Sequence, residues 1–149
     1  PGGHFRVAAD ELQRFLAAHS FPSEHEEPPR ILVVDDDPSV VEALIEAFRA
    51  AFPSSKLEGA SDGYEGLIKV GMFRPHLLAL DLRMPGLDGF EVCRRIRSDP
   101  ATRETKILAV TAYPEESAGE RALRCGADAF FAKPLALTEL MAEARRLIG

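Results

Sequence analysis

Three carboxylates, one hydroxyl and one amine stand at the ends of short apolar runs of this sequence. Asp35 and Asp36 follow the run ILVV, Asp81 follows LLAL, Thr111 closes ILAVT, and Lys133 follows AFFA. Carboxylates that share one crevice repel one another unless a cation lies among them. Mg²⁺ prefers such oxygen ligands, and a carboxylate beside a cation and an ammonium group can act as a nucleophile toward a phosphoryl group. The sequence therefore predicts phosphoryl chemistry with Mg²⁺ as cofactor, provided that the fold brings these residues together.

The elements that must position these residues begin with five short, mostly apolar runs. Each is too short for a typical helix and is bounded by turn-forming or polar residues, which favours strands. Most do not alternate between apolar and polar residues, as expected for a parallel sheet that is covered on both faces. The runs are residues 31–34, 56–60, 77–80, 107–110 and 129–132.

Apolar residues at helical spacing lie between and after the runs and predict five helices. Asp37 is a plausible N-cap with Pro38 at the first helical position, and Asp88-Gly89 opens the third helix. The apolar stripes are Val40, Val41, Leu44, Ile45 and Phe48; Tyr64, Leu67, Ile68 and Met72; Phe90, Val92, Cys93 and Ile96; the less apolar residues 115–125; and Leu140, Met141, Ala144, Leu147 and Ile148.

Strict alternation of strand and helix predicts a doubly wound α/β domain with right-handed crossovers. About 120 residues in this pattern match the flavodoxin-like, five-stranded parallel sheet of order 2-1-3-4-5 with five helices. In such sheets the site lies beyond the carboxyl ends of the strands, where the strand order reverses, which is here between strands one and three. This order brings Asp35, Asp36 and Asp81 together, with Asp81 as the expected nucleophile.

The first 29 residues do not follow this pattern. We expect a short strand and helix within residues 1–20, a linker rich in Pro and Glu over 21–29, and the α/β domain over 30–149. The chain begins at Pro1, and we interpret it as a fragment of a longer protein.

Composition excludes some classes of protein. The net charge of -6 argues against nucleic-acid binding by the chain as a whole. No apolar run approaches the length of a membrane span and no signal-peptide pattern opens the chain, so we expect a cytoplasmic protein without membrane contact. Cys93 and Cys125 lie in predicted helices and read as reduced, packed thiols.

The motifs ILVVDDDP, LALDLRMPGLDG, ILAVTAY and FFAKP resemble the receiver domain of bacterial two-component response regulators over residues 30–149. The resemblance implies that Asp81 is the phosphoacceptor and receives its phosphoryl group from a sensor histidine kinase or a phosphotransfer protein. It also implies that Asp36, Asp81 and the backbone carbonyl of Arg83 bind Mg²⁺, and that Asp35 helps through a water molecule.

The same resemblance assigns roles to the ends of the last two strands. Lys133 would contact a phosphoryl oxygen, and Thr111 would move toward the phosphoryl group on activation, aided by the backbone N–H of Ala112. Phe130 stands at the switch aromatic, which is often Tyr in this family. Phe lacks the hydroxyl, so we expect its coupling to the output face to differ in detail.

Two bulky residues are expected to tune the lifetime of the phosphoryl group. Arg83 and Tyr113 each lie two positions beyond a site residue and flank the phosphate in this family. Both can hinder the attacking water, which predicts slow autodephosphorylation.

The resemblance also suggests partners. The face made by the fourth helix, the fifth strand and the fifth helix is the expected homodimer surface. The stretch GGHFRVAADELQRFL resembles the end of an excisionase-like (MerR-type) winged helix-turn-helix domain, although Phe5 stands where a second basic residue is common. This implies DNA binding and control of transcription through the N-terminal domain of the full-length protein.

Two other functions stay open. A phosphatase of the haloacid-dehalogenase type also uses an Asp nucleophile and Mg²⁺, but it needs a second Asp two residues later, where this chain has Arg83. A receiver that acts only as a phosphorylation-independent interaction domain usually lacks one of the acidic residues or the lysine, and all are present here. Among neighbouring charges, Asp37 is interpreted as a helix cap, and Arg94, Arg95 and Arg97 as the solvated face of a helix.

Overall fold

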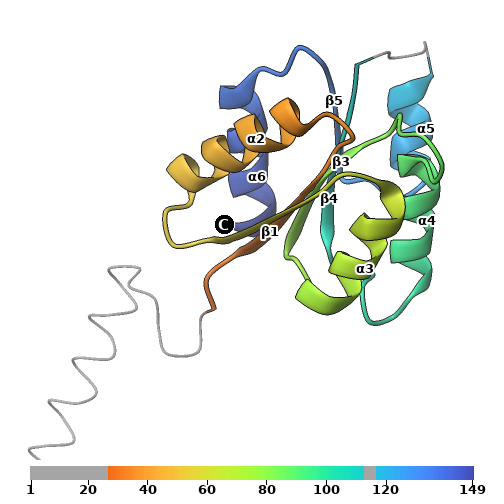
Figure 1. The fold of residues 1–149 in the computed structure, drawn as a ribbon, viewed down its shortest axis with the longest axis horizontal. Helices are drawn as coiled ribbons and strands as arrows, with labels where there is room; N and C mark the ends of the chain where they lie inside the picture. Colours follow the sequence, from red (N-terminus) through yellow and green to blue (C-terminus); the bar gives the residue numbers. More distant parts are fainter. Residues whose placement is uncertain (1–26, 113–116) are drawn as a thin grey trace, which may run out of the picture.

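The computed structural model describes residues 27–112 and 117–149. Five parallel strands form one sheet in the order β2-β1-β3-β4-β5, which confirms the predicted topology (Figure 1). The strands are β1 (Arg30–Val34), β2 (Lys56–Ala60), β3 (Leu77–Asp81), β4 (Lys106–Thr111) and β5 (Ala129–Ala132). The described residues also form the helices α2 (Pro38–Ala51), α3 (Gly63–Phe73), α4 (Gly89–Ser98), α5 (Ala118–Arg124) and α6 (Leu137–Ile148).

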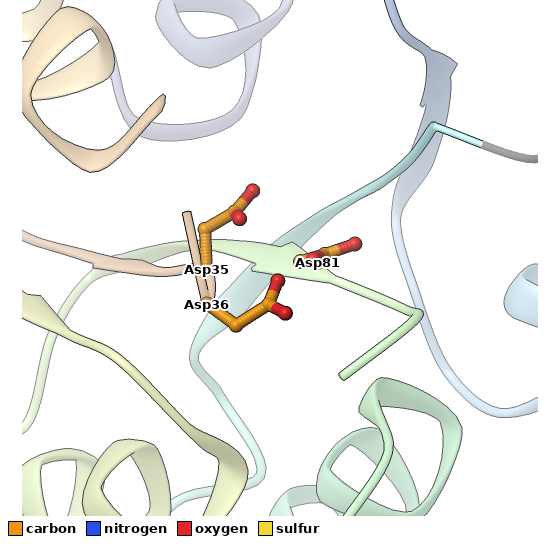
Figure 2. Close-up of side chains that lie close together, drawn as sticks. All are labelled: Asp35, Asp36 and Asp81. Carbon is orange, nitrogen blue, oxygen red and sulfur yellow. The ribbon is translucent and has the colours of Figure 1, made fainter. Parts of the chain in front are cut away.

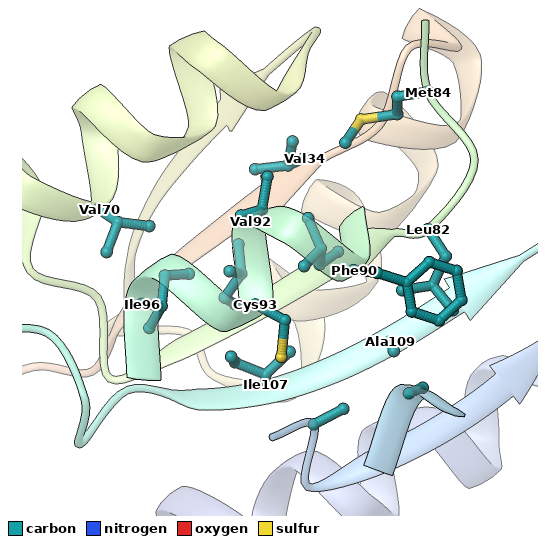
Figure 3. Packing of buried hydrophobic residues seen from close by; sticks show 14 of the residues in the cluster. Val34, Val70, Leu82, Met84, Phe90, Val92, Cys93, Ile96, Ile107 and Ala109 are labelled. Carbon is teal, nitrogen blue, oxygen red and sulfur yellow. The ribbon is translucent and has the colours of Figure 1, made fainter. Parts of the chain in front are cut away.

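The helices cover both faces of the sheet, as the apolar character of the strands requires. α2 and α6 lie on one face, and α3, α4 and α5 lie on the other (Figure 1). All five residues of β3, the central strand, are buried. Figure 3 shows how Val70 of α3, Phe90 and Ile96 of α4, and Ile107 of β4 share the core on the second face.

Aspartate side chains begin three of the helices. The Asp37 carboxylate accepts a hydrogen bond from the backbone N–H of Ser39, with Pro38 as the first helical residue, so the predicted cap is confirmed. Asp88 caps α4 in the same way, and Asp62 caps α3. Each cap satisfies an N–H group that would otherwise lack a partner in the first helical turn.

The predicted packing of α3 was wrong for most of its apolar stripe. Tyr64, Ile68 and Met72 are exposed, whereas the buried residues of this helix are Gly63, Gly66 and Val70. A Cβ atom at Gly66 would lie only 3.0 Å from the Val34 side chain, so the helix approaches the sheet on its glycine side.

Arg97 was also interpreted wrongly as part of a solvated face. Its guanidinium donates hydrogen bonds to the backbone carbonyls of Arg103, Thr105 and Gly126, and it pairs with the Asp128 carboxylate at 2.9 Å. The side chain therefore joins α4 to the loops that precede β4 and β5.

Several sequence-based expectations concern residues outside the described ranges. The proposed helix-turn-helix remnant (1–20), most of the linker (21–29) and Tyr113 stay predictions. Within the described residues both cysteines are free thiols, and burial raises the pKa of Cys93 to about 11. None of the helices described is both long and apolar enough to cross a membrane.

Candidate functional site

The acidic site lies where β1 and β3 end side by side. The two strands pair in parallel up to Val34 and Leu80, and each continues into an aspartate. Asp35 and Asp36 from β1 and Asp81 from β3 therefore meet at the carboxyl edge of the sheet (Figure 2). One carboxylate oxygen from each lies within 4.8 Å of one from each of the others. This confirms that the strand order brings the three predicted residues together.

Asp35 is the most deeply held of the three carboxylates, with 1 % of its surface exposed. Its Oδ1 accepts a hydrogen bond from the backbone N–H of Asp37 at 2.9 Å. Its Oδ2 accepts one from the Lys133 ammonium at 2.7 Å. Protein donors therefore engage both oxygens of Asp35 and hold its carboxylate against Lys133.

Asp81 lies in the centre of the site and is almost as buried. Its Oδ1 accepts a hydrogen bond from the backbone N–H of Arg83 at 3.2 Å, and its Oδ2 lies 3.9 Å from the Lys133 ammonium. Burial, followed by repulsion from the Asp35 carboxylate, raises the pKa of Asp81 to about 7, and a hydrogen bond with Asp36 acts in the same direction. Without a cation the site therefore tends to keep a proton on Asp81 near neutral pH.

The set of donors fits a hard divalent cation. Three carboxylates lie close together, and the Lys133 ammonium pairs with Asp35 and lies near Asp81. Asp36 is exposed and Asp81 reaches the same space, which leaves oxygen atoms accessible from solvent. Mg²⁺ commonly binds to one or two carboxylates and fills its remaining positions with water or phosphate oxygens.

The ends of β4 and β5 complete the rim of the site. Thr111 is buried at the end of β4, and its carbonyl accepts a hydrogen bond from the backbone N–H of Lys133 at 2.8 Å. Ala112 follows it and is exposed. The peptide bond between Lys133 and Pro134 is cis. Lys133 thus enters the site from the strand next to Thr111.

Phe130 lies behind this rim, on the α5 side of the sheet. It is half-buried and packs against the core that α3, α4 and α5 cover. A Cβ atom at Gly119 of α5 would lie 3.3 Å from its ring, so the ring faces α5 where that helix has no side chain. The neighbouring Phe131 packs against the opposite core.

Gly89, which opens α4, also lies against the end of β3. A Cβ atom at Gly89 would lie 2.3 Å from the carbonyl oxygen of Asp81 and 2.6 Å from the Cα of Leu82. The absence of a side chain lets the first turn of α4 pack directly on the backbone at the end of β3. The signal in the sequence was the Asp-Gly pair that follows the strand by a short loop.

A large cavity lies elsewhere. Its volume is about 770 Å³, and it opens at the amino ends of the strands, where Arg30, His76, Lys106 and Ile148 contribute to its wall. None of Asp35, Asp36 and Asp81 lines it. The chemistry therefore belongs to the open crevice at the carboxyl edge, where parallel sheets of this kind place their sites.

Comparison with known proteins agrees with this geometry. The family model described as the response regulator receiver domain matches residues 31–145. The chain is 43 % identical over 121 residues to Response regulator MprA of Mycobacterium sp. (strain KMS), an alignment that covers 81 % of this chain and 51 % of the relative. It is 44 % identical over 119 residues to the Mycobacterium avium (strain 104) protein of the same name, covering 80 % of this chain and 50 % of the relative. The chain thus spans about half the length of these curated relatives.

Solved structures give the same result. A signal receiver domain of a DNA-binding response regulator (merR) from Colwellia psychrerythraea 34H superposes with a TM-score of 0.77 at 31 % identity, covering 80 % of this chain and 98 % of that one. A putative response regulator from Chloroflexus aurantiacus J-10-fl superposes with a TM-score of 0.75 at 33 % identity, covering 81 % of this chain and 98 % of that one.

Proposed function

The chain belongs to the response regulator receiver domain family, and from this premise we propose that it is a phosphorylation-controlled switch in which Asp81 accepts the phosphoryl group. The observation that carries the proposal is the meeting of Asp81 with Asp35, Asp36 and Lys133 at the carboxyl edge of the sheet. Strand ends hold these groups in place, and phosphoryl transfer depends mainly on positioning and on neutralising charge.

In the proposed reaction a carboxylate oxygen of Asp81 attacks the phosphorus of a phosphohistidine. The partner is a sensor histidine kinase or a phosphotransfer protein. The new P–O bond forms on Asp81 while the P–N bond breaks, and its electron pair stays on the imidazole of the partner. Lys133 is already close to Asp81 and contacts a phosphoryl oxygen, where its charge offsets the charge that builds up.

Asp36, Asp81 and the backbone carbonyl of Arg83 are the proposed ligands of Mg²⁺, with Asp35 acting through water. When bound, Mg²⁺ supplies positive charge next to the phosphoryl oxygens. The chain itself contributes the orientation. The backbone N–H of Arg83 holds one oxygen of Asp81, and the backbone N–H of Asp37 and the Lys133 ammonium hold Asp35.

Activation is proposed to pass from the phosphoryl group to the face built from α5, β5 and α6. Thr111 and the backbone N–H of Ala112 move toward the phosphoryl oxygens, and Phe130 repacks against α5. The position of Phe130 beside α5 supports this route, because a side chain at Gly119 would already meet its ring. Homodimerisation through this face is the proposed consequence, as a shift between two packings of the domain.

The output proposed for the full-length protein is control of transcription through an N-terminal DNA-binding domain. Support comes from the resemblance of the first residues to a helix-turn-helix domain and from the Colwellia neighbour, which is described as part of a DNA-binding response regulator. We propose no turnover of an external substrate, because Arg83 stands where a haloacid-dehalogenase-type phosphatase needs its acid/base carboxylate.

The test is phosphorylation by acetyl phosphate with Mg²⁺, read by intact mass. Wild type and Asp99→Asn, a control at the far end of α4, should gain one phosphoryl group, and Asp81→Asn should gain none. Modification of Asp81→Asn to the wild-type extent would place the acceptor elsewhere. An unmodified wild type that still binds its kinase would instead support the phosphorylation-independent interaction domain.

Dimerisation is tested separately with beryllofluoride, a stable mimic of the phosphoryl group. Size-exclusion chromatography should show a larger species for wild type and no change for Asp81→Asn. A wild-type chain that binds beryllofluoride and stays monomeric would remove the dimer from the proposal without affecting Asp81.

A further inference from the structure

Helix α3 carries three large apolar side chains on the side that faces solvent. Tyr64, Ile68 and Met72 of α3 are 59 %, 62 % and 81 % exposed. They follow one another at intervals of four residues, so they form a continuous row along the helix, which we name the α3 stripe. Single exposed apolar residues are ordinary, but an aligned row of three large ones marks an interaction surface.

Loose packing of α3 against the core does not explain why the α3 stripe is exposed. The opposite side of α3 is fully engaged, with Gly63, Gly66 and Val70 buried. The added Cβ atom that would lie 3.0 Å from Val34 shows that α3 cannot approach the sheet more closely. The stripe therefore cannot turn inward without separating the helix from the core.

The position of the stripe points to the segment that would cover it. Arg30 begins β1, and its Nε donates hydrogen bonds to the carbonyls of Phe73 and Arg74, at 3.0 and 2.9 Å. Arg30 also pairs with Glu27. Arg30, where the domain begins, is therefore held at the C-terminal end of α3, and Glu27 lies beside it.

That preceding chain has an apolar row of matching size. Residues 8–19 read AADELQRFLAAH, and the sequence predicts a helix with Leu12, Phe15 and Leu16 on one side. Ten residues, 20–29, lie between this segment and Arg30. An extended, Pro-rich linker of that length spans about 31 Å, whereas an 11-residue helix such as α3 is only about 16 Å long. The segment can reach every part of the stripe.

We propose that the α3 stripe is the docking surface for the apolar side of residues 8–19 of the same chain. A tethered segment acts at an effective concentration in the millimolar range, so a small apolar contact is sufficient to hold it. A second copy of the chain is a poorer occupant, because a stable dimer needs about 800 Å² from each partner and one short helix offers far less. The inference is independent of phosphorylation at Asp81.

Docking would connect the N-terminal segment to the loop after the reactive strand. The Tyr64 ring lies 3.6 Å from the position of a Cβ atom at Gly86, in the loop between β3 and α4. The stripe thus runs from that loop to the point where the preceding chain enters the domain.

The test uses the whole chain and a single fluorescent reporter. The sequence contains no tryptophan, so Phe15→Trp introduces the sole one. Its emission should lie at shorter wavelength, and its quenching by acrylamide should be severalfold weaker, than in the double variant Phe15→Trp/Ile68→Glu. Phe15→Trp/Leu123→Glu is the matched control, because Leu123 of α5 is 52 % exposed and lies outside the stripe.

A second measurement follows Met72, a residue of the α3 stripe itself, by NMR. With methyl-labelled methionine the chain gives signals from its three methionines, and Met72→Leu identifies the one of interest. The Met72 signal should shift in Phe15→Ala and stay unchanged in Leu123→Glu.

Three outcomes would overturn the proposal. Tryptophan that is fully quenched in every variant would show that the segment does not dock. Tryptophan that is equally shielded with and without Ile68→Glu would show that it docks elsewhere. Shielding that disappears on dilution would assign the stripe to a second copy of the chain.

Discussion

Lys133 Nζ lies 2.7 Å from Oδ2 of Asp35, although 98 residues separate them in the chain. The same ammonium lies 3.9 Å from Asp81. Lys133 is a cation that pairs with this acidic cluster, and it follows β5, the strand at one edge of the sheet. The stability of a fold that holds three carboxylates so close together should therefore depend on Lys133.

Replacing Lys133 with Met should destabilise the protein when no divalent cation is present. Removal of one partner from a buried ion pair leaves an uncompensated charge, and we expect a loss of about 2–3 kcal/mol because Lys133 keeps some contact with solvent. Urea unfolding in the presence of EDTA measures this loss. Mg²⁺ should recover more stability in Lys133→Met than in wild type.

The control for this charge is Lys56→Met, which removes an exposed lysine at the start of β2. Its unfolding midpoint should stay close to that of wild type. Equal losses in the two variants would mean that the loss of any positive charge matters, and not the contact of Lys133 with Asp35.

The raised pKa of Asp81 predicts a specific dependence of stability on pH in the metal-free protein. A carboxyl group with a pKa of about 7 in the folded state and 3.8 as its ordinary value binds more protons when folded. Its contribution to stability is complete below pH 3.8 and is lost as the pH rises through about 7. Asp81→Asn cannot ionise, so its advantage over wild type should increase by about 2–3 kcal/mol between pH 5 and pH 8.

Urea unfolding in EDTA at the two pH values measures this effect. Asp99→Asn, at the opposite end of α4, should show no such increase. Saturating Mg²⁺ should stabilise wild type at pH 8 and leave Asp81→Asn nearly unchanged. A pH-independent difference between wild type and Asp81→Asn would mean that Asp81 stays ionised throughout the range.

Two glycines should respond to alanine in opposite ways. At Gly89 the added Cβ would overlap the backbone of Asp81 and Leu82, so Gly89→Ala should cost about 1–3 kcal/mol and displace the reactive strand end. At Gly71, in the exposed part of α3, the added Cβ meets no atom within 4 Å, and Gly71→Ala should stabilise the helix by about 0.5–1 kcal/mol. Thermal unfolding compares the two.

The phosphorylation rate separates the effect on the site from the effect on the fold. Gly89→Ala should react with acetyl phosphate more slowly than wild type even well below its unfolding temperature, whereas Gly71→Ala should react normally. If Gly89→Ala is less stable but reacts at the wild-type rate, then the close approach of α4 matters for packing alone.

Much of this architecture could be predicted because local signals agreed with the global pattern. The uninterrupted apolar character of residues 77–80 indicated a strand buried on both faces, and β3 is buried throughout. The carboxyl ends of adjacent parallel strands must lie at one edge, so Asp35 and Asp81 could be placed together from topology alone. The aspartates that precede Pro38 and Gly89 marked helix starts by their capping chemistry.

The predictions were wrong where contacts between different elements decide which side chains are buried or hydrogen-bonded. Hydrophobic spacing favoured Ile68 as a core residue of α3, but the helix approaches the sheet through Gly66, which counts for little on a hydrophobicity scale. Arg97 appeared to be one of several surface charges because its acceptors at Thr105, Gly126 and Asp128 are remote in the sequence. No periodicity within a helix carries that information.

The last prediction concerns how long Asp81 stays phosphorylated. Arg83 follows the acceptor by two positions and is exposed beside the site, where a long side chain can obstruct the water that attacks the phosphoryl group. We expect a lifetime of minutes or longer in wild type and a severalfold shorter one in Arg83→Ala, measured as the loss of the phosphoryl mass after removal of acetyl phosphate. Arg94→Ala, an exposed arginine of α4, is the control and should keep the wild-type lifetime. A half-life of seconds in wild type would contradict the obstruction, because the side chain would then leave the phosphorus open to water.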